Sequence, residues 1–156
     1  MKNNSKYLLV VSFLICVITI KSAKAQIERP VHWAYGLKHL SGQQYEVHLQ
    51  ATIDEGWHIY AQKQVPDAVA VPTKIVLDKT TGLKLIGVSA ELGKKDTYTI
   101  KEAGVTNYEY AGKVDFVQKV LIDPSVKEIK GKLTFQACTH EKCLNAETIN
   151  FNIPVN

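Results

Sequence analysis

Hydrophobic and polar residues alternate along several short stretches of the chain. In the clearest of these, residues 45–53, every second side chain is apolar; the apolar positions are Tyr45, Val47, Leu49, Ala51 and Ile53. The same period of two recurs in residues 132–137 and 148–153. Because successive side chains of a β-strand point to opposite faces, this period predicts strands with one buried face.

Four further stretches are rich in apolar and β-branched residues and are bounded by turn residues; they are 57–60, 74–77, 83–88 and 114–122. Trp33 and Tyr35 are expected in a first strand. No stretch has a sustained helical period with capping residues. About eight strands at a spacing of roughly ten residues are typical of a sandwich. The pattern therefore predicts an all-β fold, an immunoglobulin-like antiparallel β-sandwich.

Residues 91–112 are the least strand-like part of the chain. Gly93, Gly104 and Gly112 stand there among three tyrosines. We expect a long connection in this segment, one that lies over a functional site, because unusually long loops in compact domains tend to be functional or disordered.

The first 25 residues have the pattern of a secretory signal peptide. Lys2 and Lys6 precede an apolar run of thirteen residues, 8–20, and residues 23–25 have the small-x-small sequence of a cleavage site. An uncleaved membrane anchor is the alternative, but a membrane span needs about 20 apolar residues. We expect a single mature domain, residues 26–156, that is periplasmic or secreted and has no transmembrane segment. Cys16 would leave with the signal.

Cleavage changes the charge balance of the protein. The full chain has 19 basic and 15 acidic residues, and the signal removes four lysines, which leaves 15 of each sign. A formally neutral domain gives no electrostatic reason to expect a nucleic-acid partner. No phosphate-binding glycine loop, carboxylate pair or Ser-His-Asp order stands out, so we expect no cofactor.

Two cysteines remain in the mature chain, and such a pair in an exported protein is expected to form a disulfide. Cys138 and Cys143 stand between two predicted strands, which predicts a hairpin with four residues between them. The alternation directs Leu133, Phe135 and Ala137 inward, so Cys138 is expected on the opposite, solvent-facing side. A local disulfide at the surface can be reached by the thiol of a partner.

Three interpretations of this pair remain open on the residues alone: a redox site, a structural staple, and a metal site. The short loop counts against a staple, because so short a closure stabilises by about 2 kcal/mol, against about 4 or more for one that spans most of a domain. A structural zinc site needs four ligands, and Cys138, His140 and Cys143 supply only three. We therefore predict no metal site.

Several segments resemble one family, the N-terminal periplasmic domain of DsbD, a membrane thiol–disulfide reductase. Residues 136–138 and 142–144, Gln-Ala-Cys and Lys-Cys-Leu, resemble its active-site hairpin. Residues 56–64, Gly-Trp-His-Ile-Tyr-Ala-Gln-Lys-Gln, look like its aromatic strand, and 71–73 and 116–120 are also similar. The resemblance covers nearly the whole mature chain and implies an immunoglobulin-like fold with a thiol–disulfide exchange activity.

The resemblance also implies a mechanism and partners. Reduced Cys143 would form a mixed disulfide with an oxidised thioredoxin-fold protein of the periplasm, and Cys138 would resolve it. A cap over the pair is implied within residues 93–108, and Tyr98 and Tyr108 are the candidate capping residues.

The chain departs from the family at two places. Asn145 and Ala146 stand where members often have a proline pair, and the chain ends at Asn156 without the membrane module or the thioredoxin-like domain. A separate membrane or thioredoxin-like protein is therefore expected as the electron donor.

Other residues are candidates for a supporting role. His140, if protonated, would lower a thiol pKa, or it is a solvated residue of the hairpin tip. Tyr60 would form an aromatic wall with Trp57 and His58; for Trp57 we favour a core position and for His58 a surface or hydrogen-bonded strand position. The alternative function is a secreted, non-catalytic binding module in which the Cys138–Cys143 bond is structural.

Overall fold

The structure is a computed structural model that describes residues 28–66 and 68–155. All regular secondary structure within these residues is β-strand. The predicted signal, residues 1–25 with Cys16, lies outside the described residues, and it stays a prediction together with the domain boundary at 26. The strands are β1 (Val31–Ser41), β2 (Gln44–Ile53), β3 (His58–Tyr60), β4 (Lys74–Leu77), β5 (Leu83–Ile100), β6 (Val105–Ile122), β7 (Glu128–Phe135), β8 (Ala137–Cys138) and β9 (Glu147–Pro154).

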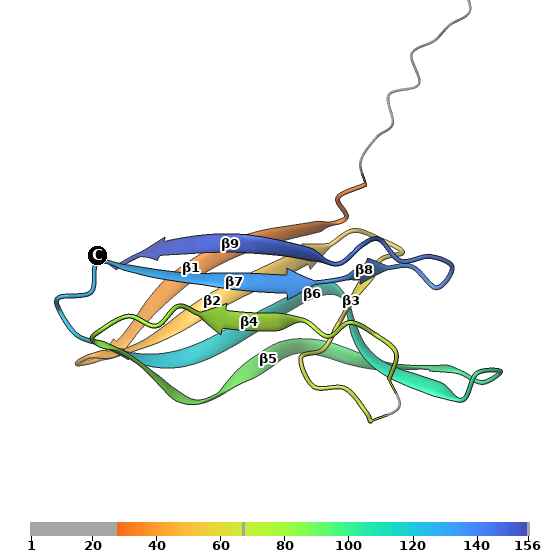
Figure 1. Cartoon of the computed structure of the whole chain (residues 1–156), viewed down its shortest axis with the longest axis horizontal. Coiled ribbons are helices and arrows are strands. Elements are labelled where there is room, and N and C mark those ends of the chain that lie inside the picture. The colour runs from red at the N-terminus through yellow and green to blue at the C-terminus, as the bar shows by residue number, and fades with distance from the viewer. Residues whose placement is uncertain (1–27, 67, 156) are drawn as a thin grey trace, which may run out of the picture.

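The strands form two antiparallel sheets that pack face to face (Figure 1). The larger sheet has the order β1-β2-β6-β3-β8, and β5 pairs with the other edge of β6. The smaller sheet has the order β4-β7-β9. Strand β6 organises the larger sheet because it pairs with β5 along its length, with β2 over one part and with β3 over another. The predicted antiparallel sandwich is confirmed.

The core lies between the sheets and is built from alternate residues, as the period of two predicts. In β2, Val47, Leu49, Ala51 and Ile53 are all buried, and the residues between them face outward or are only partly covered. The matching positions of the other sheet come from β7 and β9; they are Ile129, Leu133, Phe135, Phe151 and Ile153.

The expectation of a long connection at residues 91–112 is wrong. These residues are the ends of β5 and β6, which form one long hairpin closed by a turn at residues 101–104. Gly93 does not mark a loop; a Cβ there would lie 3.0 Å from the Lys113 carbonyl oxygen, so glycine permits a close approach of two strands beside a register shift. Gly104 has a φ of 64° and supplies the backbone conformation of the turn.

The tip of the β5–β6 hairpin and the turn after β8 lie at the same end of the sandwich (Figure 1). Among residues 28–66 and 68–155, no helix has the length and apolar character that a membrane crossing requires.

Candidate functional site

The two cysteines close a short hairpin, as predicted. Cys138 and Cys143 form a disulfide with their Cα atoms 4.0 Å apart. On either side of this pair the Thr139 amide donates to the Lys142 carbonyl (2.8 Å) and the Leu144 amide donates to the Ala137 carbonyl (2.9 Å). The cysteines are thus opposite residues of an antiparallel ladder that has four residues in its turn.

The two halves of the disulfide differ in exposure. Cys138 is fully buried, at 0% exposure, whereas Cys143 is exposed. The expectation that Cys138 faces solvent is therefore wrong. The chain leaves β7 of the smaller sheet at Gln136, and β8 then pairs with β3 of the larger sheet. Leu133, Phe135 and Ala137 belong to the core, as the alternation predicts. Cys138 lies opposite His58, outside the core cluster and on the other face of the larger sheet, but it is buried there.

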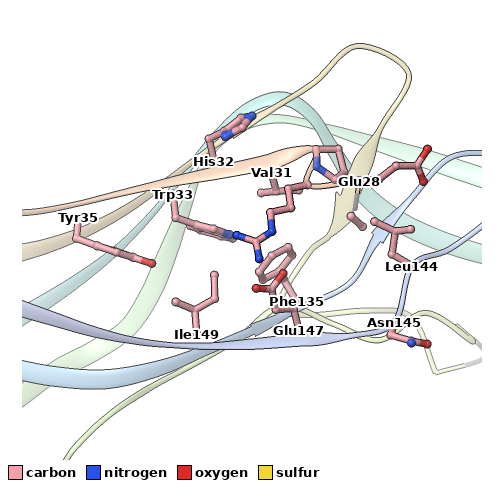
Figure 2. A pocket seen from close by; sticks show the side chains of 13 residues that line it. Glu28, Val31, His32, Trp33, Tyr35, Phe135, Leu144, Asn145, Glu147 and Ile149 are labelled. Carbon is pink, nitrogen blue, oxygen red and sulfur yellow. The ribbon is translucent and has the colours of Figure 1, made fainter. Parts of the chain in front are cut away.

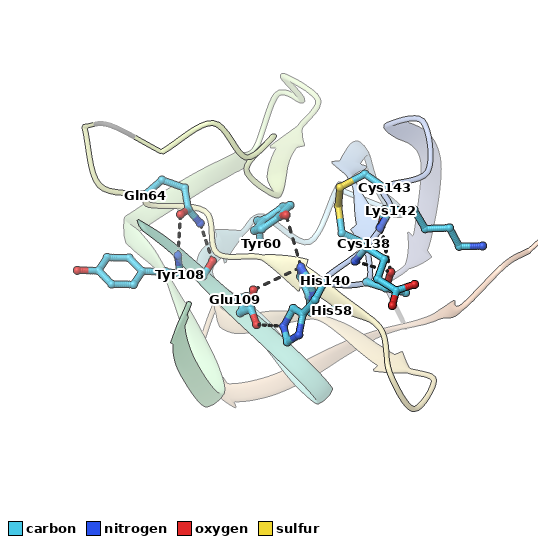
Figure 3. A network of polar contacts seen from close by, with 11 residues as sticks. His58, Tyr60, Gln64, Tyr108, Glu109, Cys138, His140, Lys142 and Cys143 are labelled. Carbon is cyan, nitrogen blue, oxygen red and sulfur yellow. Dashed lines mark hydrogen bonds and ion pairs between the residues drawn. A yellow bond between two sulfur atoms is a disulfide. The ribbon is translucent and has the colours of Figure 1, made fainter. Parts of the chain in front are cut away.

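A cluster of polar side chains lies beside this hairpin (Figure 3). His58, on β3 directly opposite Cys138, has its Nε2 3.3 Å from Glu109 Oε2. His140, in the turn between the cysteines, has its Nε2 3.5 Å from Glu109 Oε1. The hydroxyl of Tyr60 lies 3.4 Å from His58 Nε2. His58, Glu109 and Tyr60 are buried, whereas the His140 side chain is 57% exposed.

Burial controls the protonation of this cluster. Desolvation, with a smaller contribution from His140, lowers the pKa of His58 to about 4, so its imidazole is uncharged at neutral pH. Desolvation also raises the pKa of the Glu109 carboxyl, although its contact with His140 opposes that change. The pKa of Tyr60 is raised by burial and by the nearby Glu109. The site is thus a poorly solvated cluster of titratable side chains next to a disulfide.

The turn between the cysteines is held from two sides. On one side the ring of Tyr98, from β5, stacks on His140 with the ring centroids 4.2 Å apart and the planes at 4°. On the other side the Lys142 ammonium pairs with Glu28 at 2.7 Å and lies 5.4 Å from the centroid of the Trp57 ring. These contacts hold the turn against β5 and against the segments that precede β1 and β3 of the larger sheet.

Most of the residues predicted for the site meet there. Tyr60, Tyr98 and His140 all belong to the cluster around the hairpin. Tyr108 does not, since its ring lies under the Lys95 ammonium, 5.2 Å from the centroid, and points away from the disulfide in Figure 3. Its backbone instead exchanges two hydrogen bonds with the Gln64 side chain, at 2.7 and 2.8 Å.

The sequence pattern predicted two alternatives for His58 and none for Glu109. His58 was expected at the surface or in a hydrogen-bonded strand position, and the second alternative holds: it lies on β3, buried, with its Nε2 3.4 Å from the Tyr60 hydroxyl and 3.3 Å from Glu109. Glu109 was not predicted at all. The local pattern gave no signal for it, because Tyr110, Val114 and Phe116 occupy the core face of β6 and the period of two places Glu109 on the opposite face.

A cavity of about 370 Å³ lies beside the return limb of the hairpin (Figure 2). Trp33 and Tyr35 of β1 line one wall, and Phe135 and Ile149 line the other. Ala137 and Leu144, each next to a cysteine in the chain, also line it. Its lining is mainly apolar and aromatic, which suits binding better than acid–base chemistry.

These features define a class: a two-sheet, antiparallel β-sandwich domain with a local disulfide at one end. The sequence model of the family described as "Thiol:disulfide interchange protein DsbD, N-terminal" matches residues 29–154. The chain belongs to this family, and its fold is the immunoglobulin-like β-sandwich of that domain.

Solved structures agree on the fold. The N-terminal periplasmic domain of ScsB from Proteus mirabilis matches with a TM-score of 0.58 and 15% identity, over 80% of this chain and 46% of that one. The N-terminal domain of Neisseria meningitidis DsbD, in the reduced form, matches with a TM-score of 0.52 and 18% identity, over 80% of this chain and 86% of that one. This chain therefore spans about half of the ScsB chain. No curated protein matches the sequence.

Proposed function

We propose that this protein is an extracytoplasmic thiol–disulfide exchange domain that passes reducing equivalents to a thioredoxin-fold partner. The observation that carries the proposal is the unequal exposure of the Cys138–Cys143 pair in a short hairpin at one end of the sandwich. Exchange requires one sulfur that a partner can approach and a second that acts only within the domain, and this hairpin provides both.

The proposed reaction begins with the reduced pair. The Cys143 thiolate attacks one sulfur of an oxidised partner, which forms a mixed disulfide and releases the partner's other sulfur as a thiolate. The Cys138 thiolate then attacks the Cys143 sulfur, which forms the Cys138–Cys143 bond and releases the partner as a dithiol. Two electrons and two protons pass to the partner, and the domain ends in the oxidised form.

The residues around the hairpin suit this reaction. His140 lies between the cysteines and, when protonated, favours a thiolate nearby. Tyr98 stacks on His140 and takes the place of the capping aromatic residue, while Tyr60 and Glu109 lie beneath the turn. The larger sheet holds Cys138 against His58 of β3, so the resolving sulfur has a fixed position.

The family supports our inferences about the location and the electron source. We infer a periplasmic or secreted location from the predicted signal and from the periplasmic ScsB domain that has the same fold. We infer a thioredoxin-fold protein as the acceptor and a separate membrane or thioredoxin-like protein as the donor, because after exchange the pair must be reduced again.

Trapping of the mixed disulfide tests the proposal. The reduced Cys138→Ala variant, mixed with an oxidised thioredoxin-fold protein, should accumulate a covalent complex through Cys143, detected on a non-reducing gel and by mass. The Cys143→Ala variant is the matched control and should trap little, because its remaining sulfur is buried. If Cys138→Ala forms no complex although its Cys143 reacts with an alkylating agent, the proposal is wrong.

A binding module with a structural disulfide is the second candidate. The burial of Cys138 and the apolar cavity beside the hairpin favour it. The reduction potential of the pair separates the two functions, since a structural bond is expected below about −300 mV and an exchanging bond above it.

A further inference from the structure

Three side chains with metal-ligating atoms converge from three separate segments of the chain. His58 comes from β3, Glu109 from β6 and His140 from the turn between the cysteines, and one ligating atom of each lies within 4.8 Å of the other two. This convergence is a product of the fold, since the three residues are far apart in the sequence.

The spacing of these atoms suits a metal ion better than direct hydrogen bonds. Glu109 Oε2 lies 3.3 Å from His58 Nε2 and Glu109 Oε1 lies 3.5 Å from His140 Nε2, both longer than a good charge-assisted hydrogen bond. Zinc binds nitrogen and carboxylate oxygen at about 2.0–2.1 Å, so two ligand atoms of a tetrahedral site lie roughly 3.3–3.4 Å apart. One ligand atom of each residue lies within 4.8 Å of the other two, so His140, which is largely exposed, has to move closer to complete the site.

Glu109 also has an unsatisfied oxygen in the cluster. The residue is 7% exposed, and its Oε2 has no hydrogen-bond partner among the described residues. This oxygen lies 3.3 Å from His58 Nε2 without a hydrogen bond to it. A buried carboxylate oxygen without a hydrogen bond is costly, and a cation removes that cost.

We propose that His58, Glu109 and His140 bind one divalent transition-metal ion of the zinc class. Two imidazoles and a carboxylate are suitable ligands for zinc and the other divalent first-row transition metals, whereas calcium and magnesium prefer sites made only of oxygen ligands. Three protein ligands leave one position of a tetrahedral ion open for water or another small ligand. Tyr98, stacked on His140, orients the most exposed of the three ligands.

The proposed ion would connect β3, β6 and the turn of the cysteine hairpin. This site differs from a combination of Cys138, His140 and Cys143, because both sulfurs are held in the disulfide and cannot ligate in this state. The proposal is independent of thiol–disulfide exchange, and its failure would leave the exchange reaction untouched.

Zinc titration of the oxidised protein, without a polyhistidine tag, tests the site. We expect one equivalent of Zn²⁺ to bind by calorimetry and Co²⁺ to give the visible absorption of a low-symmetry, four- or five-coordinate ion. X-ray absorption of the zinc complex should show nitrogen and oxygen ligands at about 2.0–2.2 Å and no sulfur at about 2.3 Å. A sulfur ligand, or no saturable binding, would overturn the proposal.

Two variants and a control locate the ion. His140→Ala changes an exposed turn residue and should not affect folding. It should weaken zinc binding more than about tenfold, because the loss of a residue that only hydrogen-bonds to a metal ligand already lowers metal affinity by about that factor. Glu109→Gln should have the same effect if the variant folds. His32→Ala is the matched control, because His32 is an exposed histidine of β1 that lies outside the cluster, 3.4 Å from the carboxylate of Asp54.

The control should bind zinc as tightly as the unchanged protein. Equal affinity of His140→Ala and the unchanged protein would show that the cluster is an ordinary ion pair, and the proposal would fall. An equal loss in His32→Ala would show that zinc binds surface histidines without selection, with the same consequence.

Discussion

The environment of each side chain at the hairpin differs from what its residue type alone would indicate. Cys138 and Cys143 are chemically identical, yet one is fully buried and the other is exposed. His58 and His140 both contact the carboxylate of Glu109, yet burial lowers the pKa of His58 to about 4 while His140 is largely exposed. Position within the fold therefore assigns different roles to residues of one type.

The stacking of Tyr98 on His140 predicts that this tyrosine restricts access to the disulfide. An aromatic pair contributes about 0.5–1.5 kcal/mol beyond its buried area, so Tyr98→Ala should raise the population of an open hairpin roughly two- to tenfold. The rate of disulfide reduction by a small dithiol should rise by that factor. Tyr108→Ala is the control, because its ring points away from the disulfide, and equal rates in the two variants would show that Tyr98 is not a cap.

At the scale of elements, the smaller sheet depends on one close approach. Gly131 lies in β7, the central strand, where it faces Leu77 of β4 and Phe151 of β9. A Cβ at Gly131 would lie 2.5 Å from both the Val76 carbonyl oxygen and the Phe151 ring. The ring can turn, but the carbonyl belongs to the backbone of β4, so the strand itself would have to move.

Gly131→Ala should therefore lower the free energy of unfolding by about 1–3 kcal/mol, the usual cost of overpacking a core. Gly36→Ala is the matched control on β1, because a Cβ there would meet nothing within 4 Å and its φ is not positive. The control should be neutral or stabilising, since alanine restricts the unfolded chain. Urea unfolding followed by tryptophan fluorescence measures both, and equal stabilities would contradict the packing argument.

At the scale of the whole molecule, the core and the disulfide are separate. The core fills the space between the two sheets, and the cysteines lie at one end, where β8 passes from one sheet to the other. The bond closes a loop of only a few residues. Its contribution to global stability should therefore be small.

Reduction of the disulfide should leave the domain folded and cost about 2 kcal/mol of unfolding free energy, the loop-entropy value for so short a closure. Urea unfolding with and without a phosphine reductant measures the difference, and a double variant with both cysteines changed to alanine is the control for the reductant. Complete unfolding on reduction would mean that the bond is a staple, and it would favour the binding-module interpretation.

The sequence alone determined the features that rest on local pattern. The period of two fixed the faces of β2 and the end of β7, and the spacing of Cys138 and Cys143 fixed the hairpin. The residues of this hairpin and of the aromatic strand, together with other segments, also pointed to the family. These predictions succeed because side-chain direction along a strand, and the reach of a short turn, depend on neighbours in the chain.

Only the tertiary structure decided where the pattern stops and which segments meet. Residues 91–112 have glycines that suggest a loop, yet their pairing in a long hairpin with β-bulges makes them strand. The alternation directs Cys138 away from the core, but the pairing of β8 with β3 places it opposite His58, where it is buried. The pairing of β6 with β3 brings Glu109 to His58. Contacts between residues far apart in the chain depend on how the sheets pack, and no local period encodes that packing.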